Sequence, residues 1–300
     1  MRRSGFTFLE LIFVIVVMGI LAKFGVEFLT QAYRSFIASS INNTLQAQSA
    51  VAVETVASRL QFRIKDSVIG RKSSDDSFLA IGSASGSEYN ILEWVGGDIE
   101  NLRGNSSPNW SGIIDLYHPD SNSTILVSPE TNTTAINALI GTLSVANGSS
   151  GINNAALYFV GSDSDISNYG WAIPSAGAFT TQNRVMHPIN SVGGEPTHFA
   201  SDAGSFSGVD VFEYYQLAWT AYAVGIDDYN LTGDGTGTLK LWYDYQPWEG
   251  EIYTDGDEIE LMENVSTFQF KSIGSILKIQ VCVNSDIVED YSLCKEKTIY

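Results

Sequence analysis

An uninterrupted apolar segment near the N-terminus restricts the fold of this chain more than any other feature. Residues 6–22 contain a single ionisable side chain, that of Glu10. As an α-helix rising about 1.5 Å per residue, this segment would be roughly 26 Å long, close to the hydrocarbon thickness of a bilayer. Lys23 follows it, and a long basic side chain can reach the headgroups from there. We therefore predict a membrane-spanning helix over residues 6–29.

The helical pattern continues beyond the apolar segment. From residue 30 to residue 68, apolar side chains recur every three or four positions, which is the spacing of an amphipathic helix. The first proline of the chain is Pro108, so no proline separates the two parts. We predict one helix over residues 6–68, whose amphipathic part, residues 30–68, enters a globular domain.

The composition changes after this helix. Residues 69–300 are rich in Ser, Gly, Asn and Asp, with short β-branched and aromatic runs between them, a pattern typical of strands joined by turns. The predicted fold class is therefore α+β, with a β-rich globular domain over residues 69–300. The predicted strands are 77–81, 89–95, 111–117, 123–127, 155–160, 209–224, 237–245, 264–272, 275–284 and 294–300.

The charges predict the location and the partners of the globular domain. Arg2 and Arg3 precede the apolar segment, and basic residues tend to remain on the cytoplasmic side of a membrane. Everything after the segment should then reach the periplasmic or extracellular side. The chain carries 16 basic and 34 acidic residues, a net charge of −18, which argues against nucleic acid or an anionic lipid surface as the main partner.

The two cysteines of the chain, Cys282 and Cys294, lie close together near the C-terminus. An exported compartment would allow them to form one disulfide. The alternative is a pair of buried free thiols, because cysteine behaves as a small hydrophobic residue in protein cores.

The N-terminal sequence Ser-Gly-Phe-Thr-Phe-Leu-Glu, residues 4–10, followed by the apolar segment, resembles the signal of type IV pilins and type II secretion pseudopilins. The resemblance implies that residues 1–5 form a leader, which a membrane prepilin peptidase removes by cutting between Gly5 and Phe6. It also implies methylation of the new N-terminus at Phe6 and a role of Glu10 in filament assembly. The implied fold is pilin-like, with the long helix packed on an antiparallel sheet.

Elementary chemistry supports the same reading of these residues. Glycine before the cut leaves the peptide bond unshielded by a side chain. A charged residue at a bilayer centre costs about 2.5–3.5 kcal/mol on insertion scales, so the Glu10 carboxylate favours a partner. In a staggered bundle of helices, the α-amino group of a neighbour's Phe6 could be that partner. An ordinary signal peptide cleaved within residues 23–29 and a plain single-pass anchor are the alternatives.

The resemblance also implies partners and a location. The partners would be the prepilin peptidase, other pilin or pseudopilin subunits and an inner-membrane assembly platform. The protein would be a single-pass inner-membrane protein with a periplasmic domain before it enters a pilus or pseudopilus. Residues 57–63 and the C-terminal strands resemble J-type minor pseudopilins and W-type minor pilins, which implies a subunit for assembly initiation or for the tip. Unlike many major pilins, the chain has Glu27 near the place of an early helix proline.

One acidic loop resembles part of a calcium-binding loop. Asp228, Asn230 and Asp234 stand at alternate or near-alternate positions around Gly233, but position twelve is Leu239 rather than a bidentate glutamate. An acidic surface turn is the alternative interpretation. Some pseudopilins bind calcium, so the resemblance leaves calcium as the one cofactor considered. Residues 255–260 form a second acidic cluster, which reads first as a hairpin turn.

No constellation typical of catalysis is present in the sequence. His118, His187 and His198 are the only histidines, and Pro196 opposes a helical zinc motif before His198. No nucleophile elbow, phosphate loop or dinucleotide fingerprint occurs, so we predict a protein that is not an enzyme.

The aromatic runs 212–222 and 241–248 could form a sugar-binding surface or strands packed on the helix.

These patterns together predict a minor filament subunit that acts through protein contacts. The main rival is a surface adhesin or ligand-binding module that uses the N-terminal helix only for display. That rival predicts that residues 70–210 fold by themselves.

Overall fold

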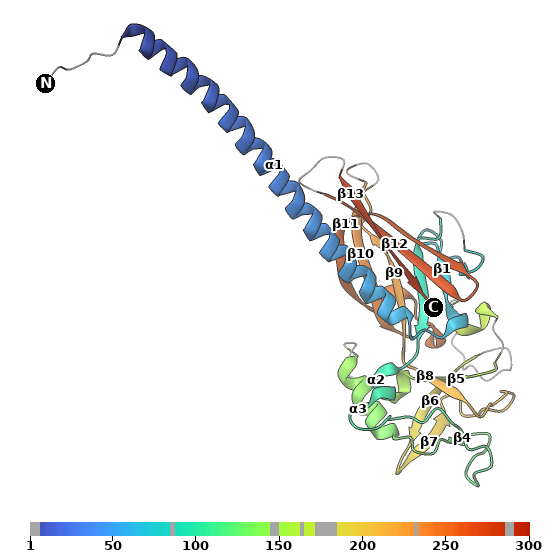
Figure 1. The fold of residues 1–300 in the computed structure, drawn as a ribbon. Helices are drawn as coiled ribbons and strands as arrows, with labels where there is room; N and C mark the ends of the chain where they lie inside the picture. The colour runs from blue at the N-terminus through green and yellow to red at the C-terminus, as the bar shows by residue number, and fades with distance from the viewer. Residues whose placement is uncertain are drawn as a thin grey trace.

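A single long helix dominates the computed structural model, which describes residues 7–84, 88–144, 150–162, 165–171, 185–230, 233, 235–285 and 291–300. Helix α1 runs from Phe8 to Leu60 without a break. Its first half projects alone, and its second half lies against the globular part of the chain (Figure 1). The predicted α+β class, with a long apolar N-terminal helix on antiparallel sheets, is confirmed.

The helix ends earlier than the apolar spacing predicted, at Leu60 rather than at residue 68. Backbone hydrogen bonds to a neighbouring strand hold the following residues out of the helix. The Ile64 N–H donates to the Val95 carbonyl at 3.0 Å, and the Gly97 N–H donates to the Phe62 carbonyl at 2.8 Å. A 3₁₀ turn, η1 (Lys65–Ser67), follows. Ile64 is still buried, so the spacing identified core residues correctly although the backbone is not helical.

The larger sheet has eight antiparallel strands in the order β13-β12-β11-β10-β9-β3-β1-β2. Strand β10 has the predicted bounds and β12 and β13 nearly so, whereas β11 begins before the predicted strand 264–272 and the predicted strand 209–224 is divided between β8 (Tyr215–Ala218) and β9. The strands are β1 (Ile69–Arg71), β2 (Phe78–Ala80), β3 (Ile91–Gly96), β9 (Thr220–Asp227), β10 (Gly237–Tyr245), β11 (Asp257–Ile273), β12 (Ile276–Asn284) and β13 (Ser292–Ile299). Two short 3₁₀ turns, η4 (Pro247–Glu249) and η5 (Tyr253–Asp255), join β10 to β11.

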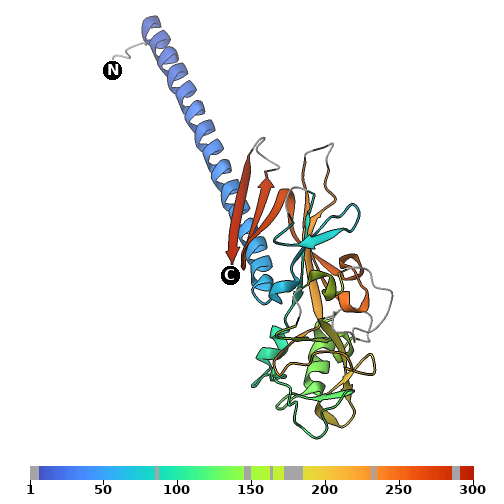
Figure 2. The ribbon, with the colours of Figure 1, turned by 90° about the vertical axis from the view of Figure 1, so that its right-hand side faces the viewer.

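The second half of α1 packs against the β11–β13 end of this sheet, and Figure 2 shows β12 and β13 beside it. Its buried residues recur at helical spacing, as in Ile41, Leu45 and Ala52, and form one cluster with residues of β12 such as Ile279 and Val281. Along β12 buried and less buried residues alternate, because successive side chains of a strand point to opposite faces. The face of the sheet toward α1 is therefore the apolar one.

A long insertion, residues 97–219, leaves the larger sheet after β3 and returns at the adjacent strand β9. It forms a five-stranded sheet in the order β4-β7-β6-β5-β8 at the end of the molecule away from the N-terminus (Figures 1 and 2). Its elements are α2 (Ile99–Arg103), β4 (Ile125–Val127), α3 (Thr133–Leu143), η2 (Ile152–Asn154), β5 (Ala156–Phe159), η3 (Ile166–Tyr169), β6 (Met186–Val192), β7 (Glu195–Ser201) and β8 (Tyr215–Ala218).

Most errors of the strand prediction fall in this insertion. Strands β6 and β7 were not predicted, and each contains a proline, a residue that usually argues against a strand. Helix α3 was also missed, although Asn132 caps its N-terminus by accepting a hydrogen bond from the Ala135 N–H at 3.0 Å. The predicted strand 111–117 is wrong, because only Ile113 forms an isolated bridge there.

The insertion shares a hydrophobic core with the larger sheet. One cluster contains Trp171 and Met186 of the insertion together with Trp242 and Tyr245 of β10. Moreover, β1 and β3 lie before the insertion in the chain, and in the larger sheet β1 pairs with β3 and β3 pairs with β9. A cut at residues 70 and 210 would separate β3 from its partner β9, whereas residues 97–219 leave and re-enter the sheet between these two strands.

Asp98 lies buried where the insertion begins, and it gives the first testable prediction. Burial raises the pKa of its carboxyl from 3.8 to about 7, and the hydrogen bond from the Asn101 N–H, at 3.1 Å, opposes this only in part. Because the folded state holds this proton more tightly than the unfolded state, stability should fall by roughly 2–4 kcal/mol as the pH rises from about 4 to about 7.

We expect Asp98→Asn to remove this part of the pH dependence while keeping a side-chain acceptor for the helix cap. Urea midpoints of the full chain in detergent, measured at pH 5 and pH 8, provide the test. The natural protein should lose more stability between the two pH values than the variant does. Glu93 and Glu249 also have pKa values raised to about 7, chiefly by burial, and they are present in both proteins. An equal loss in both proteins would contradict the prediction.

Candidate assembly surface on the N-terminal helix

The first half of α1 is exposed on all sides. Between Thr7 and Ser40 every residue is exposed except Ile37, which is half-buried, and the first buried residue is Ile41. Large apolar side chains on this half are exposed to solvent, among them that of Leu9, which is 80% exposed. Within the described residues, α1 is the one helix long and apolar enough to cross a membrane. This location supports single-pass anchoring near the N-terminus.

The carboxylate of Glu10 has a local partner that the sequence analysis missed. Glu10 Oε2 accepts hydrogen bonds from the Thr7 N–H at 3.3 Å and from the Thr7 hydroxyl at 3.1 Å. Thr7 is the N-cap residue of α1, and Glu10 is the third residue of the helix. Threonine followed three residues later by glutamate is a recognised signal for a helix N-terminus, so the sequence contained this information. The predicted cleavage and methylation residues, Gly5 and Phe6, lie outside the described residues.

Exposed aromatic side chains continue past the length that a membrane requires. A span needs about 20 residues, whereas the helix runs from Phe8 to residue 40 without contacting the sheet through a buried side chain. Tyr33 is 65% exposed and Phe36 is 71% exposed, both on the stretch between the apolar segment and the globular part. Exposed apolar surface of this extent is typical of an interaction site.

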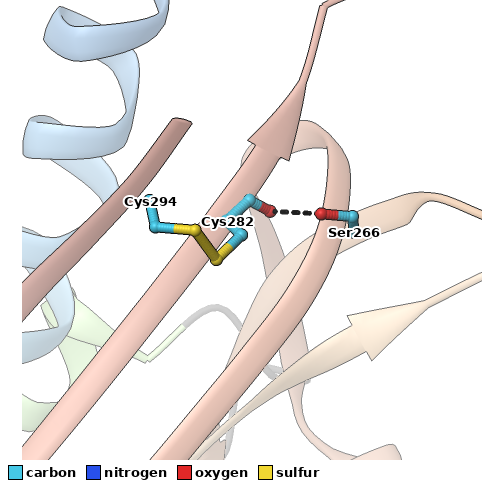
Figure 3. Close-up of a disulfide and its surroundings, with 3 residues drawn as sticks. All are labelled: Ser266, Cys282 and Cys294. Atoms are coloured by element: carbon cyan, nitrogen blue, oxygen red, sulfur yellow. Dashed lines mark hydrogen bonds between the residues drawn. A yellow bond between two sulfur atoms is a disulfide. The ribbon is translucent and has the colours of Figure 1, made fainter. Parts of the chain in front are cut away.

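The disulfide between Cys282 and Cys294 is confirmed (Figure 3). The two cysteines are directly opposite each other on β12 and β13. Ser266 of β11 donates a hydrogen bond to the Cys282 carbonyl at 3.3 Å. The bond therefore ties the edge strand β13, which contacts α1, to the interior of the sheet.

We expect Cys282→Ala combined with Cys294→Ala to destabilise the globular part. Because the bond closes a short loop, its removal should cost about 2–3 kcal/mol, chiefly through the greater freedom of the unfolded chain. The test is urea unfolding of the double variant, followed by tryptophan fluorescence. The oxidised natural protein treated with dithiothreitol should move toward the midpoint of the variant. Coinciding midpoints of the variant and the oxidised protein would contradict this expectation.

The acidic loop proposed for calcium connects β9 to β10. The Asn230 N–H donates to the Thr236 carbonyl at 3.0 Å, so the loop closes as a hairpin turn. Asp228 has a φ of 53°, a left-handed conformation that suits such a turn. Asp234 lies outside the described residues. No group of three or more His, Cys, Asp and Glu residues in the described part of the chain has an arrangement suited to a metal ion, so calcium binding here stays a prediction.

The structure brings two of the three histidines together. Nδ1 of His118 and Nε2 of His198 lie 3.7 and 3.6 Å from Oδ2 of Asp120. His198 belongs to strand β7 rather than to a helix, as the proline before it indicated. His187 lies elsewhere, with its ring 5.3 Å from the ring of Phe159.

The acidic residues 255–260 do not form the predicted hairpin turn, because they end η5 and begin β11.

The two aromatic runs serve mainly as packing. Trp219, Trp242, Tyr245 and Trp248 are buried, and the runs supply β8, β9, β10 and η4. Tyr214 is 56% exposed and is an exception. Most of these rings therefore stabilise the junction of the two sheets instead of forming one open surface.

The chain was compared with known protein families, curated proteins and solved structures. No protein-family model, curated protein or solved structure matches this chain.

Proposed function

We propose that this protein is a minor subunit of a type IV pilus-like or type II secretion pseudopilus filament, assembled through the first half of α1. The observation that carries the proposal is the continuity of α1. One unbroken helix joins a first half that is exposed on all sides, and apolar up to Ala22 except for Glu10, to a second half that is buried on the sheet along one face. Such a rod can bury its exposed half only against a membrane or other helices.

The length of the exposed half favours helices of other subunits over a membrane alone. A lipid anchor explains the apolar segment as far as about residue 29, but not Tyr33 and Phe36 beyond it. Neighbouring helices in a filament would cover both stretches. Lys23 and Glu27 lie 3.9 Å apart on the same helix and partly neutralise each other at the end of the apolar segment.

The N-terminal signal defines how the subunit would enter the filament. Removal of residues 1–5 by the prepilin peptidase would free a positive α-amino group at Phe6. In the monomer, Glu10 accepts two hydrogen bonds from Thr7 through one oxygen. In a bundle, a neighbour's amine would add the opposite charge that a carboxylate in an apolar setting favours.

The insertion supports a position at the filament end. It lies at the pole opposite the exposed half of α1 (Figure 1). Subunits anchored in a membrane would join from the side of the exposed half of α1, so a neighbour at the insertion pole would be a subunit added earlier. The bulk of residues 97–219 would occupy the space of such a neighbour, which favours a position that no earlier subunit precedes, in initiation or at the tip.

The mass of the mature N-terminus tests the proposal. In cells with a prepilin peptidase, we expect loss of residues 1–5 and gain of one methyl group. Replacing Gly5 by valine should leave the full-length chain uncut, because the added side chain shields the peptide bond. A natural protein that keeps Met1 in such cells, or that is cut within residues 23–29, would contradict the proposal.

An adhesin displayed by the helix is the second candidate, and the same insertion favours it. A segment at the pole far from the membrane is well placed for contact with a surface. The two candidates differ in one result. Deletion of the gene should abolish filaments if the protein initiates assembly, whereas it should leave filaments intact but non-adherent if the protein acts only in display.

A further inference from the structure

A large groove lies among elements of the larger sheet, outside the surface assigned to assembly. Its volume is about 1460 Å³. Its lining comes from the start of β3, the β9–β10 turn, the η5 connection and the strands β11, β12 and β13. Single small molecules usually occupy sites of about 300–1,000 Å³, so the groove has room for a longer ligand.

Strands β11 to β13 contribute a polar row to this groove. Gln269, Gln280 and Glu296 are register partners on three neighbouring strands, and directly opposite residues share a face of the sheet. Residues 277, 279 and 281 of β12 belong to the core against α1, so the alternating Gln280 points to the other face. Each glutamine amide offers both donors and an acceptor, which suits pairs of hydroxyl groups.

Aromatic rings supply the rest of the recognition chemistry. Tyr229 lines the groove and is 42% exposed, and Tyr89 lines it with a half-buried ring. Tyr253 and Trp242 are more deeply buried in the lining and contact each other edge to face, with ring centroids 5.1 Å apart. Aromatic rings present apolar faces to a ligand, while the amides supply hydrogen bonds.

The charges of the lining argue for a neutral ligand. Lys240 pairs with Asp227 at 2.8 Å and with Glu258 at 2.9 Å, and Lys278 pairs with Glu296 at 2.9 Å. With Lys271, which also lines the groove, three lysines lie among the four lining carboxylates, so the charges at the groove nearly cancel. An anionic ligand would meet these carboxylates on a chain whose net charge is −18.

An extended peptide added as a strand does not fit this groove. The central lining strands, β11 and β12, are interior strands with neighbours on both sides. Their backbone groups are therefore already paired, and strand addition requires an open sheet edge.

We propose that this groove binds a neutral oligosaccharide through the Gln269–Gln280 row and the exposed ring of Tyr229. The glutamine amides hydrogen-bond to sugar hydroxyls, and the aromatic ring packs against the apolar face of a sugar unit. This inference does not depend on filament assembly, because the groove residues lie outside the first half of α1.

Calorimetric titration of the full chain tests the proposal. The protein is held in a zwitterionic detergent without a sugar headgroup, since a maltoside would compete for the site. The probes are maltohexaose, cellohexaose, chitohexaose and mannohexaose, with hexagalacturonate as an anionic comparison. We expect saturable binding of at least one neutral hexasaccharide, at least about tenfold tighter than its monosaccharide, because more contacts form along the groove.

A matched pair of variants locates the binding. Gln269→Ala with Gln280→Ala should weaken it about tenfold or more through two lost hydrogen bonds. Gln216→Ala, an exposed residue of β8 outside the groove, should leave it unchanged. No binding of any neutral probe at millimolar concentration, preference for hexagalacturonate, or equal affinity in the groove variant would overturn the proposal.

Discussion

Glu10→Ala is expected to leave N-terminal cleavage intact and to reduce incorporation into filaments by at least tenfold. The predicted cleavage site, between residues 5 and 6, precedes the helix in the chain, whereas Glu10 is the third residue of the helix and lies in its exposed apolar segment. Loss of one member of a buried charge pair usually costs about 3–5 kcal/mol, far more than a tenfold change in an equilibrium requires. The measurement is the ratio of this protein in sheared filaments to that in membranes, by quantitative immunoblot.

Two controls separate charge pairing from other effects of the change. Glu27→Ala removes a carboxylate of the same helix that already has a partner on that helix, Lys23 at 3.9 Å, so Glu27 needs no charge from a neighbour and the change should reduce incorporation less than Glu10→Ala does. Thr7→Val removes the hydroxyl that donates to Glu10 but keeps the carboxylate, so incorporation should persist. Normal incorporation of Glu10→Ala would refute the charge-pairing role.

Arg71→Met is expected to destabilise the globular part by about 3–5 kcal/mol at pH 8, the usual cost of removing one partner of a buried ion pair. Arg71 Nε donates to Glu93 Oε2 at 2.8 Å, and both side chains are almost fully buried. The same guanidinium donates to the carbonyls of Asp76, at 2.9 Å, and Trp171, at 3.2 Å. Arg71 therefore links β1, β3 and the insertion.

The acid-base chemistry of Glu93 sets the pH dependence of this effect. Burial raises the pKa of Glu93 to about 7, and the Arg71 charge opposes that rise. Without Arg71 the pKa should rise further, so the variant keeps Glu93 protonated to higher pH. Since deprotonation then costs more, the variant should lose stability relative to the natural protein as the pH rises from 5 to 8.

Urea unfolding of two further variants tests whether the loss of stability in Arg71→Met comes from the buried ion pair. Arg71→Met with Glu93→Leu should recover roughly half of the lost stability, because the double change leaves no unpaired buried carboxylate. Arg59→Met, which removes a half-exposed arginine paired with Glu100 at 3.2 Å, should cost about 1 kcal/mol or less. A loss below 1 kcal/mol for Arg71→Met itself would show that the buried pair does not stabilise the fold.

Much of the fold was predictable where the signal is local. The apolar spacing identified α1 and most of its buried residues, and β-branched and aromatic runs between turn residues identified β10 and β12. The segment 61–68 was wrong because its spacing is helical but its backbone pairs with β3, a strand about 30 residues away in the chain. Strands β6 and β7 were missed because Pro188 and Pro196 argue locally against strands, although pairing with their neighbours accommodates both.

Of the two candidate sites, the N-terminal signal was predictable from the sequence and the groove was not. The signal at residues 4–10 is contiguous, so it was visible in the sequence, and the hydrogen bonds from Thr7 to Glu10 could have been inferred from the spacing of these two residues. The groove was not visible, because Gln269, Gln280 and Glu296 lie on three strands and carry no motif. Their common location follows from strand register alone.

The sequence by itself determined the long helix with its exposed apolar half, the two cysteines able to pair and the β-rich character of the rest. These features depend on the period and composition of neighbouring residues. The tertiary structure alone decided where the helix ends, how residues 97–219 are inserted between β3 and β9, the burial of the Arg71–Glu93 pair and the lining of the groove. Each of these depends on backbone hydrogen bonds and side-chain contacts between segments far apart in the chain, which no local pattern encodes.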